Sequence, residues 1–180
     1  MIYMLLANGF EEVEAMAPLD LLRRAELEVK TVSIEKTREV TGAHGITVTA
    51  DVMPAEATEE ISLLILPGGM PGTTNLDASA FTDVMIQRAL DANGHLAAIC
   101  AAPMIYGKRG LLSGRSAVCY PGFEKYLKGA VLSEKSVVTD QNVTTAVGMG
   151  AAIEFGAGLI AVLRDREAAQ RVLSAIQAKK

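Results

Sequence analysis

The chain has 180 residues, enough to bury a core without disulfides, and we expect one domain over residues 1–180. Half of the residues are hydrophobic, only 4% are aromatic and the net charge is −4, which argues against a nucleic-acid-binding protein. With two cysteines and no apolar stretch of the roughly 20 residues that a membrane span needs, we expect a cytoplasmic protein without a disulfide framework or a membrane partner.

The first third of the chain predicts strands around one helix. Residues 2–7 form an apolar run that lacks the basic start and long apolar segment of a signal peptide, so we expect a buried strand. Residues 11–24 have helical spacing, residues 28–34 alternate as a strand, and residues 39–52 indicate a β-hairpin. The expected apolar side of the helix consists of Val13, Met16, Leu19 and Leu22.

The rest of the chain continues the alternation of strands and helices. The expected strands are 62–66, 96–99 and 115–120, with a hairpin over 136–147. The expected helices are 79–92, 101–109, 151–163 and 165–178, the last capped by Asp165. This order indicates an α/β fold with a mostly parallel sheet and helices on both faces. Such folds bind ligands at the carboxyl ends of their strands, where three predicted turns follow Ala7, Leu66 and Ile99.

The stretch from Gly94 to Pro103 contains the strongest functional signal. Its apolar residues predict a strand buried on both faces, and Pro103 suits the first turn of a helix. A strand that turns sharply into a helix places Cys100 at the sheet edge, as in a nucleophile elbow. We predict that the positive end of the helix dipole lowers the pKa of this thiol, which then reacts as a thiolate. The alternative is a small core residue, the common fate of a free cysteine.

Three acids follow the first strand, at Glu11, Glu12 and Glu14. We expect Glu11 and Glu12 to complement the helix dipole at the surface. Glu14 is predicted to point inward, where burial and a neighbouring thiolate raise its pKa. A protonated Glu14 could donate a hydrogen bond to the Cys100 sulfur and move protons during catalysis. Glu14 lies on the same side of the predicted helix as Phe10, Ala17 and Pro18.

The turn after Leu66 contains two glycines, Gly68 and Gly69, which allow the backbone to approach a ligand closely. We predict that the backbone N–H groups of Gly69 and Ala101 form an oxyanion hole. The alternative is a tight connection between a strand and a helix. Neither GxxxxGK[ST] nor GxGxxG occurs in the chain, so a phosphate loop is not predicted.

The two histidines are not expected to act as the base for Cys100. His95 begins the strand that leads to the cysteine and is therefore predicted at the far end of that strand. His44 lies in the first hairpin, where we expect a surface or interface residue. Because no HxH, HxxxH or CxxC spacing is present, we predict no metal site, and no cofactor is expected.

Three motifs in this order resemble the DJ-1/ThiJ/PfpI superfamily, in its small DJ-1-like branch. They are GFEEVEA at residues 9–15, LPGG at 66–69 and AAICAAP at 97–103. The resemblance continues to GMGAAIEF at 148–155 and covers essentially the whole chain. It implies the flavodoxin-like sandwich shared with class I glutamine amidotransferases, and a homodimer. Residues 16–22 are the expected part of the dimer surface on the first helix.

By motif, Cys100 resembles the reactive, peroxide-sensitive cysteine of the family. Glu14 resembles the protonated acid bonded to it, and Gly69 and Ala101 resemble the residues whose N–H groups form the oxyanion pocket. PfpI-type proteases have Cys-His-Gly where this chain has Cys100-Ala101-Ala102, so peptidase activity is not expected. Gly68, Tyr120 and Arg24 are expected to surround the pair as supporting residues.

The chain departs from the family pattern at several positions. Tyr120 stands where some DJ-1-like members have a histidine near the cysteine, and tyrosine is a poor base near neutral pH. His44 replaces the hairpin arginine, although Arg24 matches the helix arginine, which weakens the case for an anion site at the interface. Residues 148–151 read GMGA in place of the common GPGT. Cys119 is expected to be buried and inert, the alternative being a resolving cysteine for oxidised Cys100.

The resemblance implies an enzyme with glyoxalase III-like or deglycase-like activity on small α-oxoaldehydes, such as methylglyoxal and glyoxal, or on their adducts. The Cys100 thiolate would attack the aldehyde carbon and Glu14 would move the protons. The alternative is a non-catalytic, redox-responsive stress or chaperone protein in which peroxide oxidises Cys100. ThiJ-like proteins are also labelled thiazole monophosphate biosynthesis proteins, but no residue pattern in this chain supports phosphate binding.

Overall fold

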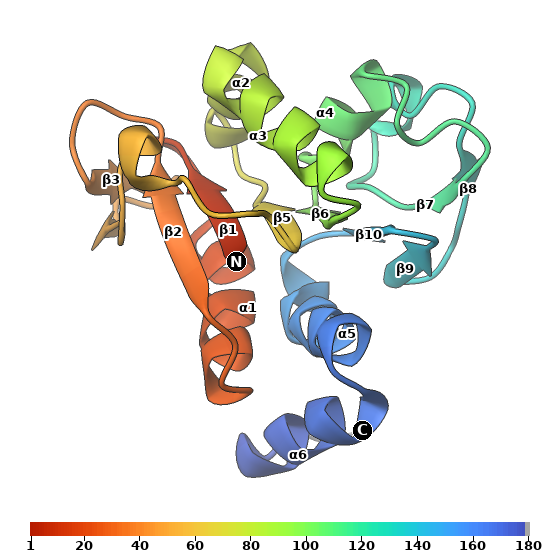
Figure 1. The fold of residues 1–180 in the computed structure, drawn as a ribbon. Helices are drawn as coiled ribbons and strands as arrows, with labels where there is room; N and C mark the ends of the chain where they lie inside the picture. Colours follow the sequence, from red (N-terminus) through yellow and green to blue (C-terminus); the bar gives the residue numbers. More distant parts are fainter. Residues whose placement is uncertain (179–180) are drawn as a thin grey trace.

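Runs of apolar residues form the strands of a central six-stranded sheet in the computed structural model, which describes residues 1–178 (Figure 1). The strand order is β2-β1-β5-β6-β10-β9, and all neighbours are parallel except β10 and β9. The strands are β1 (Ile2–Leu6), β2 (Val29–Ser33), β5 (Leu63–Leu66), β6 (His95–Ile99), β9 (Val137–Asp140) and β10 (Val143–Ala146). The predicted mostly parallel sheet and the predicted hairpin over 136–147 are confirmed.

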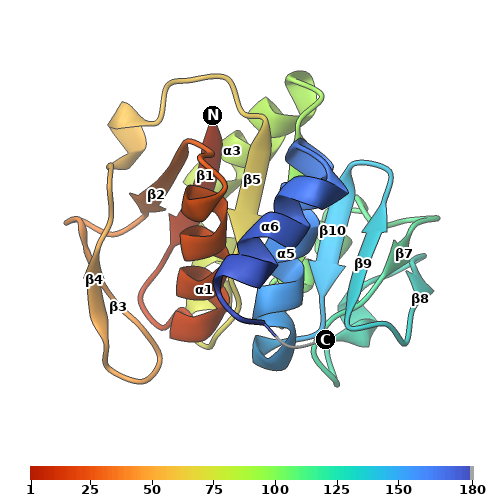
Figure 2. The same ribbon diagram turned by 90° about the horizontal axis from the view of Figure 1, so that it is seen from below.

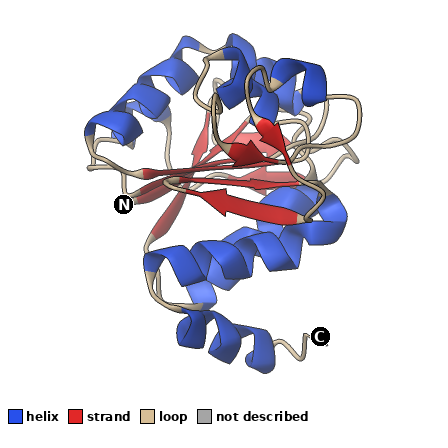
Figure 3. Cartoon of the chain, turned by 90° about the vertical axis from the view of Figure 1, so that its right-hand side faces the viewer, coloured by secondary structure: helices blue, strands red, loops and turns tan. Residues whose placement is uncertain are grey.

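Helices cover both faces of the sheet (Figure 2, Figure 3). One face carries α1 (Glu12–Arg24), α5 (Ala152–Leu163) and α6 (Arg166–Ala175). The other carries α2 (Gly72–Ala78), α3 (Ala80–Asp91) and α4 (Pro103–Lys108). Successive residues of a strand point to opposite faces, so Met4 packs in one apolar cluster and Leu5 in the other. This double burial explains why the central strands are apolar throughout.

Smaller elements lie at the two sides of the main sheet. The antiparallel pair β3 (Glu39–Thr41) and β4 (Thr47–Thr49) is the hairpin predicted over 39–52. At the other side, β7 (Ser116–Ala117) pairs in parallel with β8 (Val131–Leu132). Three short 3₁₀ helices are η1 (Pro54–Glu56), η2 (Glu124–Tyr126) and η3 (Met149–Ala151). Among residues 1–178, no helix has the length and apolar character needed to cross a membrane.

Two predictions about strands and helices are wrong in detail. The strand expected over 115–120 covers only Ser116–Ala117 and lies outside the main sheet. Its continuation bonds instead to the Thr145 hydroxyl through the N–H of Val118, and to the Cys100 carbonyl through the N–H of Tyr120. Helix α2 was missed because its sequence, GTTNLDA, has a single large apolar residue and no helical period.

The structure also tests the predicted cap of α6 and the predicted apolar face of α1. Asp165 caps α6 as expected, since its Oδ1 accepts a hydrogen bond of 2.7 Å from the N–H of Ala168. The predicted apolar face of α1 is only partly correct, because Val13 is 45% exposed. The buried side of that helix instead includes two carboxylates, Glu12 and Glu14.

Helices α1 and α5 pack closely where α5 has a glycine. A Cβ at Gly156 would lie 2.7 Å from Cδ1 of Leu21 and 3.0 Å from Cα of Pro18. The Pro18 contact is with backbone, which cannot move aside without shifting α1. The position of α1 on the sheet, and with it the position of Glu14, therefore depends on a small residue in α5.

We expect the substitution Gly156→Ala to lower the free energy of unfolding by about 1–3 kcal/mol, because the added methyl group overpacks this contact. Urea unfolding followed by circular dichroism measures the change. The matched control is Gly158→Ala in the same helix, where the nearest atom to an added Cβ is Cγ1 of Val137 at 3.8 Å. That variant should be neutral or more stable by up to about 1 kcal/mol. Equal effects of both substitutions would contradict the tight contact.

Candidate active site

Cys100 lies in the sharp turn between β6 and α4 with a φ of +66°, in the left-handed region that non-glycine residues rarely adopt. Neighbouring segments fix this backbone. The Cys100 N–H donates to the carbonyl of Ala146 at 2.9 Å, and its carbonyl accepts from the N–H of Tyr120 at 2.8 Å. The predicted nucleophile elbow is confirmed, and the side chain of Cys100 is partly accessible.

Glu14, in the first turn of α1, lies within hydrogen-bonding reach of the Cys100 thiol and is 1% exposed. The N–H of Gly68 donates to its Oε2 at 3.1 Å, and the nearby N–H of Met149 also lowers the pKa of this carboxyl group. The N–H groups of Gly69 and Ala101 lie close enough to the Cys100 sulfur to lower the pKa of the thiol. The structure thus brings Cys100, Glu14, Gly69 and Ala101 together.

Gly68 lies against both the Glu14 carboxyl group and the Cys100 side chain, and the space at this position is too small for any side chain. A Cβ at this position would overlap Oε2 of Glu14 and lie 2.6 Å from Cβ of Cys100. It would also lie 2.9 Å from the carbonyl oxygen of Ile99. Glycine at this position therefore allows the thiol and the carboxyl group to meet.

Burial governs the ionisation of both groups. Burial raises the pKa of Glu14 to about 7, and the charge of Glu11 adds a smaller increase. The hydrogen bonds that the carboxylate accepts act in the opposite direction. Burial, together with the adjacent Glu14, raises the pKa of the Cys100 thiol to about 12 despite the N–H groups of Ala101 and Gly69. The predicted lowering of the thiol pKa is therefore wrong. Burial therefore disfavours a charge on either member of the pair.

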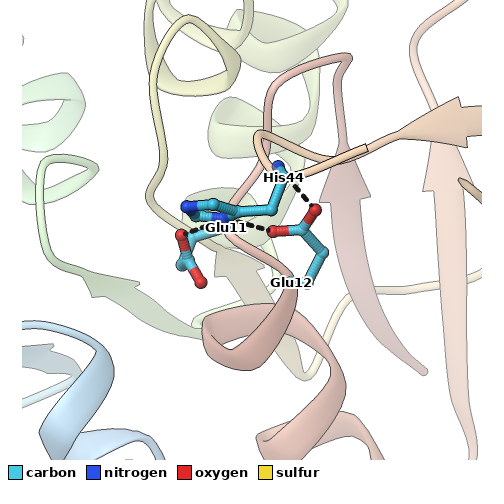
Figure 4. Close-up of side chains that lie close together, drawn as sticks. All are labelled: Glu11, Glu12 and His44. Atoms are coloured by element: carbon cyan, nitrogen blue, oxygen red, sulfur yellow. Dashed lines mark hydrogen bonds and ion pairs between the residues drawn. The ribbon is translucent and has the colours of Figure 1, made fainter. Parts of the chain in front are cut away.

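Glu12 is 5% exposed and does not lie at the surface as predicted. Its Oε1 accepts hydrogen bonds from the N–H groups of His44 at 2.8 Å and Ile46 at 3.4 Å. Its Oε2 lies 2.9 Å from Nδ1 of His44, and Oε2 of Glu11 lies 3.4 Å from the same nitrogen (Figure 4). Burial opposes ionisation of Glu12, but the hydrogen bonds from His44 hold its pKa below the ordinary value. The sequence pattern missed this contact because the partners are 32 residues apart.

Of the three residues expected to support the pair, Gly68 and Tyr120 lie next to it. The Tyr120 ring contacts Gly148, whose added Cβ would lie 3.3 Å from Cδ2 of Tyr120 and 3.9 Å from Oε1 of Glu14. Arg24 does not belong to this group. It pairs with Asp20 at 2.6 Å at the other end of α1, about 15 Å along the helix from Glu14. The sequence match placed Arg24 correctly in the helix, but it did not show how far this residue lies from the Cys100 thiol.

The remaining candidates lie apart from Cys100 within this chain. His95 begins β6, as predicted, and its Nε2 lies 2.8 Å from Oγ1 of Thr144, while burial lowers its pKa to about 4. Cys119 is buried in the cluster under α3 and α4, whereas Cys100 packs against the cluster under α1 and α5. Burial raises the pKa of Cys119 to about 11. The two thiols therefore point to opposite faces of the sheet.

The chain is similar in sequence to proteins of one family along most of its length. Residues 1–162 match the sequence model of the DJ-1/PfpI family. DJ-1beta from Drosophila melanogaster is 31% identical over 171 residues, which are 93% of this chain and 91% of that protein. A deglycase from Pyrococcus horikoshii is 35% identical over 143 residues, 77% of this chain and 84% of that protein. Two longer DJ-1 homologues from Arabidopsis thaliana match over 37% and 42% of their length.

The fold is similar to a solved structure of the same family. DJ-1 from Toxoplasma gondii, solved in an oxidised form, aligns with a TM-score of 0.95 at 33% identity over 99% of this chain and 98% of that chain. The predicted flavodoxin-like arrangement is therefore confirmed. On the sequence match and the structural match together, the chain belongs to the DJ-1/PfpI family.

Proposed function

We propose that this protein is a cofactor-independent enzyme with glyoxalase III-like or deglycase-like activity on small α-oxoaldehydes such as methylglyoxal. The observation that carries the proposal is the buried Glu14 beside the Cys100 thiol, with a pKa of about 7. A general base works best when its pKa lies near the working pH. The similarity to a deglycase supports the same class of chemistry.

In the first step, the Glu14 carboxylate takes the proton of the Cys100 thiol while the sulfur bonds to the aldehyde carbon. The carbonyl electrons move to the oxygen, and the N–H groups of Gly69 and Ala101 would bind the resulting oxyanion, a role that their closeness to the sulfur supports. Glu14 then returns its proton to this oxygen, which completes a hemithioacetal. Glu14 is then a carboxylate again, and the net charge of the site is the same as before the reaction.

In the second step, the neighbouring ketone of methylglyoxal acidifies the C–H bond of the hemithioacetal carbon. Glu14 removes this proton, which gives an enediol when the ketone oxygen is protonated, and returns it to the adjacent carbon. The hydroxyl group of the former aldehyde carbon gives up its proton in exchange for the one taken by the ketone oxygen, and the product is a lactoyl thioester on Cys100. Water then cleaves the thioester and releases lactate and the thiol. The sum is methylglyoxal plus water to lactate and one proton, so no external oxidant or reductant is needed.

Glu14 is the proton carrier that the surroundings of Cys100 offer. His44 is engaged with Glu12, and His95 with Thr144 at the far end of β6. Tyr120 borders the site, but a phenol is a weak base near neutral pH.

A second function uses the same thiol as a peroxide sensor. Two successive reactions with peroxide would convert Cys100 to a sulfenic and then a sulfinic acid, with water released each time. The N–H groups of Gly69 and Ala101 would bind the new oxygens, and protonated Glu14 would donate to them. The oxidised form of the similar Toxoplasma gondii protein favours this candidate. A disulfide with Cys119 is disfavoured, because the two thiols face opposite sides of the sheet.

A homodimer is part of this proposal, with a surface that differs from the one expected over residues 16–22. Leu19 and Leu22 pack in the chain's own core. Exposed apolar side chains lie instead near the starts of α1 and α5, at Val13, Met149 and Ile153. These side chains are the better candidates for contact with a second copy.

The protein is expected to convert methylglyoxal to lactate over many turnovers without glutathione. Cys100→Ser should abolish turnover, and Glu14→Gln should lower kcat at least about 100-fold because an amide cannot accept and return the proton. Cys119→Ser, the matched thiol control, should retain the wild-type rate. An enzymatic lactate assay measures all four proteins. Consumption that stops near one equivalent per chain would overturn the proposal and favour the sensor function.

The reaction of Cys100 with iodoacetamide should become faster as the pH rises through about 7, because the carboxylate form of Glu14 accepts the thiol proton and is present above its pKa. In Glu14→Gln this inflection should disappear. Mass spectrometry of the tryptic peptide that contains Cys100 gives its rate at each pH separately from the reaction of Cys119, which lies in another peptide. An unchanged inflection in Glu14→Gln would show that a different group acts as the base.

A further inference from the structure

Glu11, Glu12 and His44 form a cluster of potential metal ligands outside the Cys100–Glu14 pair (Figure 4). We propose that this cluster binds one divalent transition-metal ion, with zinc as the best fit. Each side chain offers one ligand atom, and the three atoms lie within 4.8 Å of one another. Two of the ligands come from the start of α1 and the third from the tip of the β3–β4 hairpin.

The donor set selects the class of metal. One imidazole nitrogen with two carboxylate oxygens suits zinc and its neighbours in the first transition row. Magnesium and calcium prefer sites made only of oxygen atoms. Three protein ligands leave the fourth tetrahedral position of zinc to water. The cluster thus matches an open zinc site rather than a closed structural one.

The distances fit a tetrahedral ion with small movements. Bonds of about 2.0–2.2 Å to zinc place neighbouring ligand atoms about 3.3–3.6 Å apart. Nδ1 of His44 lies 3.4 Å from Oε2 of Glu11 and 2.9 Å from Oε2 of Glu12. The His44 side chain is 68% exposed and that of Glu11 is 14% exposed, so the His44 ring is the ligand that can adjust most easily.

Glu12 is held as a ligand before any ion arrives. Its carboxylate is buried at 5% exposure, and the N–H groups of His44 and Ile46 occupy Oε1, which directs Oε2 toward the His44 ring. Gly42 packs against the same carboxylate, and a Cβ there would overlap it. Fixed outer hydrogen bonds of this kind orient ligating carboxylates in metal sites. A surface ion pair would need neither the burial nor this orientation.

The competing interpretation is an ion pair between the two carboxylates and a protonated His44. The hydrogen bond with Glu12 and the charges of Glu11 and Glu12 raise the pKa of His44, so the cluster attracts a proton. A metal ion would displace this proton from Nδ1 and take its place between the carboxylates. The two interpretations therefore differ in whether the cluster holds zinc at neutral pH.

Isothermal titration with zinc chloride tests the site in the Cys100→Ser background, which removes the reactive thiol as a ligand. We expect one zinc ion per chain, and at least about tenfold weaker binding in His44→Gln and Glu12→Gln. The control is Asp20→Asn, which removes one carboxylate of α1 outside the cluster and should not change the affinity. Circular dichroism verifies folding. If Glu12→Gln is unstable, the exposed His44 decides the result alone.

No zinc binding in the Cys100→Ser protein would overturn the proposal, and so would equal affinity in His44→Gln. Either result would leave the ion pair as the role of the cluster. Cobalt(II) gives a second readout, because a tetrahedral site produces visible absorption that His44→Gln should remove. This test is independent of turnover, so a failure of the proposed enzyme activity would not affect it.

Discussion

The site depends on the absence of a side chain at Gly68, where three segments of the chain meet. Gly68 lies in the turn after β5, its N–H donates to the Glu14 carboxylate, and its carbonyl accepts from the N–H of Glu11 at 2.9 Å. The start of α1 is thereby attached to the end of β5. Since β5 pairs with β6, which leads into Cys100, the acid and the thiol come from sequence-distant segments and still face each other.

Burial at this point determines what chemistry the pair can do. A thiol at a helix start is often acidic, but here the loss of solvent and the neighbouring acid outweigh the N–H groups at the sulfur. The same loss of solvent moves the pKa of Glu14 to about 7. In the proposed reaction, the transfer of the thiol proton to Glu14 would accompany the formation of the bond to the substrate. The strained backbone of Cys100 contributes by presenting the sulfur at the sheet edge.

Features that rest on local pattern could be predicted from the sequence, and features that rest on distant contacts could not. The apolar runs predicted the parallel strands, and the small residues around Cys100 predicted the elbow. Helical spacing alone placed Glu14 inward. By contrast, the partner of Glu12 lies in a hairpin 32 residues away, and no local pattern shows it. The thiol pKa was wrong for a related reason, since the helix dipole is visible in a sequence but the degree of burial is not.

The hairpin and the reacting pair are linked through the charge of Glu11. This residue contacts His44 on one side, and on the other its charge adds to the rise of the Glu14 pKa. Any cation held at His44, whether a proton or a metal ion, offsets that charge. We expect the pKa of Glu14 to fall when such a cation is bound. The hairpin tip contributes no atom to the proposed reaction, but its charge is expected to act on the proposed base through Glu11.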